Sequence, residues 1–229
     1  MSEILILRHG PTAWNTEKRM QGRSDISLSP EGESLVGQWS LPEEWYRIPW
    51  YVSPLKRAQQ TAKILGKETI TIEPLLTEMS WGDWEGKRLP ELRKTLGSTL
   101  QGMEDQGLDL LPPGGESPRQ VQRRLEPFLS RLGKQDKSTV CVAHKGIIRA
   151  LYAKASEWNM LGKPPQKLKD NCAHLFKVLR SGRIEISVMN LSLLNEIHNF
   201  PLPNYQRESN LDEKPKKIQG KTPGKNNEC

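Results

Sequence analysis

The stretch Ile4–Gly22 opens with Ile4-Leu5-Ile6-Leu7-Arg8-His9-Gly10 and runs through a polar segment to Gln21-Gly22. Its four consecutive apolar residues, two of them β-branched, predict a strand that is buried on both faces, as in the middle of a parallel sheet. A guanidinium and an imidazole follow this strand directly, before any helical pattern resumes. Because ligands in open α/β sheets bind outside the carboxyl ends of the strands, we expect Arg8 and His9 to face a ligand.

The rest of the chain repeats an alternation of strands and helices. Apolar runs predict strands at 48–52, 69–73 and 139–143, and a hairpin made of 173–179 and 183–188. A serine followed by a proline predicts helix starts at Ser29, Ser53 and Ser117. We therefore expect an α/β fold with a mostly parallel central sheet, helices on its faces and the hairpin at its C-terminal edge.

Two segments depart from this alternation. Residues 97–115 are rich in glycine, proline and acidic side chains, which predicts a lid-like insertion. Apolar residues nearly disappear from residue 203 onward, and such a composition cannot offset the entropy of ordering the chain. The sequence therefore predicts one domain over 1–200, followed by a disordered basic tail over 203–229.

Composition limits the classes of function. The 34 basic and 27 acidic residues give a net charge of +7 that is dispersed along the chain, which favours small anions over nucleic acid as partners. No apolar run approaches the roughly 20 residues that span a bilayer, and we find no secretory signal, so no membrane partner is expected. Three widely spaced cysteines argue against disulfides and predict a cytoplasmic protein. Neither Cys-x-x-Cys nor His-x-x-x-His occurs, so we expect no metal.

Polar side chains follow three of the predicted strands. Arg8 and His9 end the first, His144 follows 139–143, and Arg57 lies early in the helix that follows the strand at 48–52. Arg57 is off the apolar stripe of that helix, so its side chain can lean back over the strand end. If the strands are neighbours, these groups share one rim, and their charge predicts an anion among them. Guanidinium groups match phosphate oxygens bidentately, so a phosphoryl group is the expected guest.

Other polar residues are expected either to contact the phosphoryl group or to have structural positions elsewhere. Asn15 and the backbone near Gln21 and Gly22 are expected to complete the phosphate cradle, since glycine permits close approach. His174 and His198 are interpreted as structural or surface residues, and Cys141 as a core residue in the middle of a strand.

Several motifs follow one another along the chain. They are Arg8-His9-Gly10-Pro11-Thr12-Ala13-Trp14-Asn15, Gln21-Gly22, Leu28-Ser29-Pro30-Glu31-Gly32, Ser53-Pro54-Leu55-Lys56-Arg57, Glu78 ahead of Gly82-Asp83-Trp84-Glu85-Gly86, Pro113-Gly114-Gly115-Glu116-Ser117 and Ala143-His144-Lys145-Gly146. Together they resemble the histidine phosphatase superfamily, in its phosphoglycerate-mutase-like branch. The resemblance covers about residues 3–190.

The resemblance implies a role for each matching residue. His9 is the expected nucleophile, which becomes phosphorylated transiently, and Glu78 the expected proton donor and acceptor. Arg8, Arg57 and His144 are expected to hold the phosphoryl oxygens, and Asn15, Gln21 and Gly22 match positions that line the phosphate pocket. The neighbouring arginines favour a neutral His9, the form that can attack phosphorus. No cofactor is implied.

Three functions fit these residues. We expect a metal-independent phosphomonoesterase that hydrolyses a small phosphorylated metabolite, because 97–115 contains no Arg or Lys, whereas mutases of this branch carry an arginine pair there. Phosphoglycerate mutase-type phosphoryl transfer is the first alternative, and a non-catalytic interaction protein on the same fold is the second. The motifs also resemble broad-specificity and α-ribazole phosphatases. A homodimer is a possible assembly.

Overall fold

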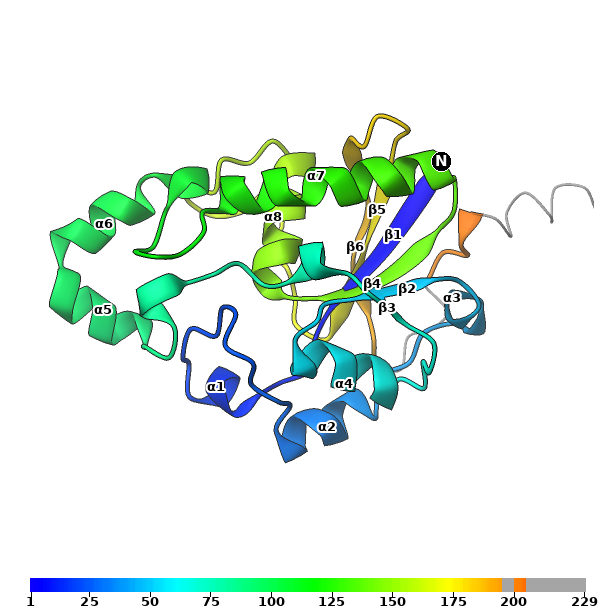
Figure 1. Cartoon of the computed structure of the whole chain (residues 1–229), viewed down its shortest axis with the longest axis horizontal. Helices are drawn as coiled ribbons and strands as arrows, with labels where there is room; N and C mark the ends of the chain where they lie inside the picture. Colours follow the sequence, from blue (N-terminus) through cyan, green and yellow to red (C-terminus); the bar gives the residue numbers. More distant parts are fainter. Residues whose placement is uncertain (195–199, 205–229) are drawn as a thin grey trace, which may run out of the picture.

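A six-stranded sheet runs through the middle of the molecule (Figure 1). The structure is a computed structural model and describes residues 1–194 and 200–204. The strands lie in the order β3-β2-β4-β1-β5-β6, of which the first four are parallel and β5 is antiparallel to both neighbours. Their bounds are β1 Ser2–Arg8, β2 Trp50–Val52, β3 Thr71–Ile72, β4 Thr139–Ala143, β5 Cys172–Val178 and β6 Ile184–Ser192. The predicted α/β fold with a mostly parallel sheet and a C-terminal hairpin is confirmed.

Helices cover both faces of this sheet. Helices α7 and α8 lie on one face, and α2, α3 and α4 on the other (Figure 1). The helices are α1 Ala13–Thr16, α2 Pro30–Val36, α3 Glu43–Tyr46, α4 Lys56–Ile64, α5 Leu89–Leu96, α6 Ser98–Glu104, α7 Pro118–Gln135 and α8 Lys145–Ala155. Short 3-10 turns are η1 Pro74–Leu76, η2 Gly82–Trp84 and η3 Gly107–Asp109.

Strand β1 is apolar without interruption because each of its faces meets a helical layer. Ile4 and Ile6 pack in the cluster that includes α7 and α8, whereas Leu5 and Leu7 pack in the cluster that includes α2 and α4. All four side chains are fully or almost fully buried. Burying a side chain of this size stabilises a fold by about 1.5–3 kcal/mol, so β1 anchors both halves of the core.

Two of the three predicted helix starts are confirmed. The hydroxyl of Ser29 accepts from the N–H of Gly32, and that of Ser117 accepts from the N–H of Gln120 in a reciprocal capping box. The third prediction is wrong: α4 begins at Lys56, and its first turn has no side-chain cap. The Ser53 hydroxyl has a different partner, which belongs to the candidate site.

The segment between η2 and α7 projects beyond the end of the sheet (Figure 1). It comprises α5, α6 and η3, and a separate apolar cluster of Trp84, Leu92 and Leu100 holds it together. The predicted insertion at 97–115 therefore begins within a larger excursion that includes α5. The predicted tail lies outside the described residues from 205 onward. Within the described part of the chain, every helix is too short or too polar to cross a bilayer.

Candidate active site

The carboxyl ends of β2, β4 and β1 lie side by side at one edge of the sheet. The chain continues the parallel pairing beyond two of them, because the N–H of His9 donates to the Ala143 carbonyl at 3.0 Å and the N–H of Ser53 to the Val142 carbonyl at 3.1 Å. The imidazoles of His9 and His144 consequently meet, with ring centroids 5.1 Å apart. The predicted convergence of these strand ends is found.

Two contacts fix the protonation of His9. Its Nδ1 lies 2.6 Å from the Gly10 carbonyl, which can only accept, so Nδ1 carries the proton. The Nε of Arg57 lies 3.2 Å from His9 Nε2, and a guanidinium can only donate, so Nε2 presents a lone pair. Burial, together with the charges of Arg8 and Arg57, holds the pKa of His9 well below its usual range. The side chain is therefore a neutral imidazole at neutral pH.

Arg57 leans back from the first turn of α4 over the strand end, as predicted, and is fully buried. Its two terminal nitrogens donate to the carbonyls of Gly22 and Ser24, each at 2.8 Å. Gly22 has a φ of +53°, and a Cβ there would lie 2.0 Å from the carboxylate of Glu85. The Gly22 carbonyl therefore orients Arg57, and the contact of the Gly22 backbone with phosphate stays a prediction.

Glu85 organises the loop that holds Arg57, a role that sequence reasoning missed. Its carboxylate accepts from the backbone N–H groups of Arg23 and Ser24, both at 2.8 Å, and from the Ser24 hydroxyl at 2.6 Å. It also accepts from the N–H of Trp81 at 3.2 Å. Arg23 and Ser24 are more than fifty positions away from Glu85 in the sequence, so no local pattern indicates these contacts.

His144 is fully buried behind the edge of the sheet, and Ser53 is its partner. The imidazole Nε2 lies 2.7 Å from the Ser53 hydroxyl, whereas Nδ1 has no partner among the described residues. Burial is the main reason that the pKa of His144 lies well below its usual range, and the neighbouring imidazole of His9 and the guanidinium groups of Arg57, Arg8 and Arg124 add to it. An imidazole with one unsatisfied ring nitrogen is suited to bind a group that the protein itself lacks.

Glu78 lies on the loop after η1 and is buried. Its carboxyl oxygens accept from the backbone N–H groups of Met79 at 2.8 Å and of Gly146 at 3.1 Å. Burial raises the pKa of Glu78, although the two N–H groups and the arginines oppose the shift. A carboxyl group in such a site holds its proton to higher pH than an exposed glutamate does.

His9, Arg57 and Glu78 line one cavity of about 590 Å³. His144, whose ring contacts that of His9, is not among the lining residues. Arg8 also forms an ion pair with Asp170 at 3.2 Å, another contact that the sequence did not indicate. The predicted residues that line the cavity are Arg8, His9, Asn15, Gln21, Gly22, Arg57 and Glu78.

The structure also shows two of the residues that we interpreted as lying outside the site. His174 is buried, and its Nδ1 accepts from the N–H of Asn190 at 3.1 Å, which confirms a structural role. Cys141 is buried in β4, and burial raises the pKa of its thiol, so it is a core residue. His198 lies outside the described residues. Among the residues that are described, no three His, Cys, Asp or Glu side chains are grouped to hold a metal ion.

Comparison with known proteins identifies this arrangement. The model of the histidine phosphatase superfamily (branch 1) matches residues 4–192, which is most of the chain. This chain belongs to that superfamily. The matched range contains the positions of the predicted site residues, from Arg8 to His144.

Relatives in the superfamily include mutase-like proteins and phosphatases. Phosphoglycerate mutase-like protein 4 of Arabidopsis thaliana is 30% identical over 196 residues, covering 82% of this chain and 84% of the relative. The glucosyl-3-phosphoglycerate phosphatase of Mycobacterium tuberculosis is 31% identical over 179 residues, covering 69% of this chain and 79% of the relative. A solved structure of mycobacterial glucosyl-3-phosphoglycerate phosphatase with VO3 superposes with a TM-score of 0.67 at 25% identity, covering 83% of this chain and 99% of that one.

Proposed function

We propose that this protein is a metal-independent phosphomonoesterase that acts through a phosphohistidine. The observation that carries the proposal is the state of His9: its proton is held on Nδ1 by Gly10, and its Nε2 lone pair lies in a cavity beside Arg57. A neutral imidazole with this tautomer is a nucleophile. Hydrolysis of phosphate monoesters is extremely slow without a catalyst, and a covalent intermediate divides it into two easier transfers.

In the first transfer, His9 Nε2 attacks phosphorus and the bond from phosphorus to the ester oxygen breaks. Glu78 gives its proton to that oxygen, so the alcohol leaves neutral. In the second transfer, a water molecule attacks phosphorus, the bond from phosphorus to Nε2 breaks, and the Glu78 carboxylate takes the water proton. The products are inorganic phosphate and the original enzyme.

The remaining groups stabilise charge on the phosphoryl oxygens. Arg57 already points its Nε at the attacking nitrogen, and a phosphoryl oxygen can replace that nitrogen as the acceptor. The Ser53 hydroxyl accepts from the N–H of Leu55 and can donate to Nε2 of His144, which leaves an N–H on Nδ1 for another oxygen. Donors that are fixed before the reaction contribute more than donors that must reorient during it.

Hydrolysis is favoured over mutase-type transfer by the charge of the projecting segment. No lysine or arginine occurs in 97–115, and Arg93 of α5, which reaches the cavity, is paired with Glu104 at 2.9 Å. The projecting segment therefore lacks the free arginine pair that mutases of this branch carry there. Relatives named as phosphatases of glucosyl-3-phosphoglycerate and of phosphoserine agree with hydrolysis of a small phosphorylated metabolite.

The test is release of phosphate from p-nitrophenyl phosphate in the presence of EDTA, together with acid-labile labelling of the protein. We expect His9→Ala to abolish both, and His174→Ala, at the buried structural histidine, to leave both nearly intact. An active, labelled His9→Ala protein would refute the mechanism. Isomerisation of 3-phosphoglycerate with 2,3-bisphosphoglycerate supplied would identify a mutase, and absence of all turnover an interaction protein.

The other expectations stay predictions within this proposal. They are the absence of a cofactor, of a nucleic-acid partner and of a membrane partner, a cytoplasmic location, a homodimer as a possible assembly, and a place among broad-specificity or α-ribazole phosphatases.

A further inference from the structure

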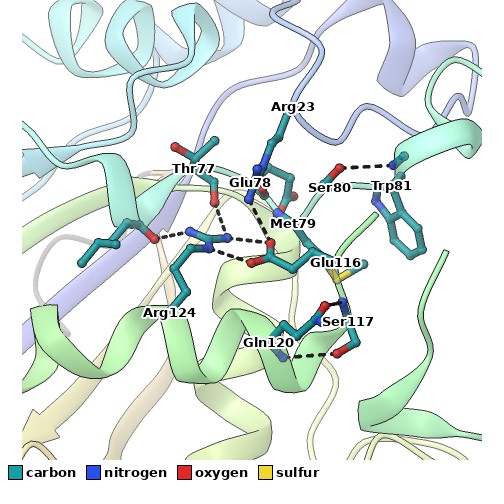
Figure 2. A network of polar contacts seen from close by, with 12 residues as sticks. Arg23, Thr77, Glu78, Met79, Ser80, Trp81, Glu116, Ser117, Gln120 and Arg124 are labelled. Carbon is teal, nitrogen blue, oxygen red and sulfur yellow. Dashed lines mark hydrogen bonds and ion pairs between the residues drawn. The ribbon is translucent and has the colours of Figure 1, made fainter. Parts of the chain in front are cut away.

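Arg124 of α7 binds the backbone on the N-terminal side of Glu78. Its terminal nitrogens donate to the carbonyls of Leu75 and, at 3.0 Å, of Thr77 (Figure 2). The Arg124 side chain is only 16% exposed, so these contacts form largely out of water. A single guanidinium thus spans the turn that precedes the proposed acid.

Glu116 holds that guanidinium in place. Its carboxylate accepts from Arg124 Nε at 2.8 Å and from a terminal nitrogen at 3.0 Å, which is the bidentate geometry of a strong arginine–carboxylate pair. The Glu116 side chain is 13% exposed. The same carboxylate accepts from Arg23 at 3.3 Å, so one acid joins two arginines (Figure 2).

The C-terminal side of Glu78 is held from the same cluster. Arg23 Nε lies 3.4 Å from the Glu78 carbonyl, and the N–H of Glu116 donates to the Ser80 carbonyl at 2.9 Å. The carboxyl of Glu78 itself receives only backbone N–H groups, from Met79 and Gly146. The path of the backbone through residues 75–80 therefore decides where the carboxyl lies.

We propose that Arg124, fixed by Glu116, is the positioning residue that holds Glu78 in place as proton donor and acceptor. This inference rests on the proposed function, because it assigns a task to the carboxyl that the proposal uses. Arg124 is not among the residues that line the cavity, and its contacts reach the Glu78 carboxyl through the backbone carbonyls of Leu75 and Thr77. Lysine keeps the charge but offers one nitrogen, which cannot reach two carbonyls and a carboxylate together.

The test compares Arg124→Lys with wild type in single-turnover phosphorylation of His9. Two substrates are used: p-nitrophenyl phosphate, whose leaving group departs without a proton, and glycerol 3-phosphate, whose alkoxide needs one. General acid catalysis contributes about 10²–10⁴-fold, so a displaced acid is expected to slow labelling from glycerol 3-phosphate by about 10- to 100-fold. Labelling from p-nitrophenyl phosphate is expected to change less than about 3-fold, because it gains little from the acid.

Three further variants make the result specific. Arg123→Lys, at the exposed neighbour of Arg124, is the matched control and is expected to leave both rates unchanged. In a Glu78→Gln background, Arg124→Lys is expected to cost nothing more, because residues that act through one another are not additive. Glu116→Gln, which keeps the shape but loses the charge, is expected to slow labelling from glycerol 3-phosphate more than labelling from p-nitrophenyl phosphate, as Arg124→Lys does. It tests the same proposal if Arg124→Lys does not fold.

The outcomes separate the two proposals. If wild-type His9 takes no label from either ester, the proposed function fails, and this inference fails with it. If wild type is labelled and Glu78→Gln discriminates between the esters, the proposed function stands. Equal slowing with both esters in Arg124→Lys, full activity with both, or additive losses with Glu78→Gln would then overturn the role of Arg124 alone.

Discussion

The backbone N–H of Gly146 donates to Glu78 Oε2 at 3.1 Å, which joins the first turn of α8 to the carboxyl of the candidate site. That turn follows directly on His144, so one peptide segment contacts both the proposed acid and the second histidine. The contact requires glycine, because a Cβ at position 146 would lie 2.4 Å from Glu78 Oε1.

Gly146→Ala is expected to displace the carboxyl and lower kcat for alkyl phosphates by about 10-fold or more, as loss of part of the acid catalysis. Stability is expected to change little, since alanine favours a helix by about 1 kcal/mol over glycine and offsets some of the strain. Steady-state kinetics and urea denaturation measure the two effects. Gly102→Ala in α6 is the control, because nothing lies within 4 Å of its added Cβ. Unchanged kinetics in Gly146→Ala would contradict the proposed role of Glu78.

Ser53→Ala removes the hydrogen-bond partner of His144. A buried polar group left unsatisfied costs about 1–3 kcal/mol, so we expect a fall in stability, and kcat/KM is expected to fall about 10-fold because the Nδ1 proton is no longer fixed. Nitrogen-15 NMR of the imidazoles reports the tautomer directly. Ser34→Ala, at an exposed serine of α2, is the control. The same His144 tautomer in wild type and in Ser53→Ala would contradict this prediction.

The pH dependence of His9 phosphorylation is expected to differ between substrates. Burial raises the pKa of Glu78, so the acid form persists above its usual range and is lost as the pH rises through the raised value. Labelling from an alkyl phosphate is therefore expected to decline on the alkaline side, and labelling from p-nitrophenyl phosphate is not. The acid limb is expected well below pH 6.5, because the pKa of His9 is lowered by burial and by the arginines. Identical alkaline limbs for the two esters would count against Glu78 as the acid.

Stability is expected to fall as the pH drops below 6.5. Burial lowers the pKa of His174 to about 4, so between pH 6.5 and about 4 the unfolded chain binds a proton there that the folded chain does not. The contribution of this histidine is fully present above pH 6.5 and amounts to about 3 kcal/mol over that window. Urea denaturation of wild type and His174→Gln at a series of pH values measures it. A pH dependence equally steep in the variant would show that His174 is not responsible.

Lys145 and Arg149 are expected to select substrates with a second anionic group. Both line the catalytic cavity one turn apart on α8, and neither forms a hydrogen bond or ion pair with a described residue, although Arg149 stacks 5.2 Å over the Trp158 ring. Arg149→Gln is expected to raise KM for a phosphorylated carboxylic acid about 10-fold, and KM for p-nitrophenyl phosphate much less. Lys154→Met, further along α8, is the control. Equal changes in KM for both substrates would remove the selectivity argument.

Local sequence patterns were sufficient to predict most of the strands and helices. The unbroken apolar run of Ile4–Leu7 predicts burial on both faces, and the proline after Ser29 or Ser117 marks a helix start, because both signals act within a few residues. Ser53-Pro54 carries the same signal and fails. Its hydroxyl binds His144, 91 positions away, and α4 starts later without a side-chain cap. The tertiary partner outweighs the local preference.

The sequence by itself determined which residues end the strands, and hence that Arg8, His9 and His144 would share one edge of the sheet if their strands are neighbours, with Arg57 leaning toward them; the structure supplies that strand order. Only the tertiary structure decided how these groups are oriented: the Nδ1 proton of His9, the carbonyls that hold Arg57, the partner of His144, and the cluster of Arg124 and Glu116 around the Glu78 loop. The physical reason is the separation in sequence of the residues that interact. Strand and helix patterns arise from neighbouring residues, whereas the hydrogen bonds that aim a side chain join distant segments and often end on backbone atoms, which are the same in every residue.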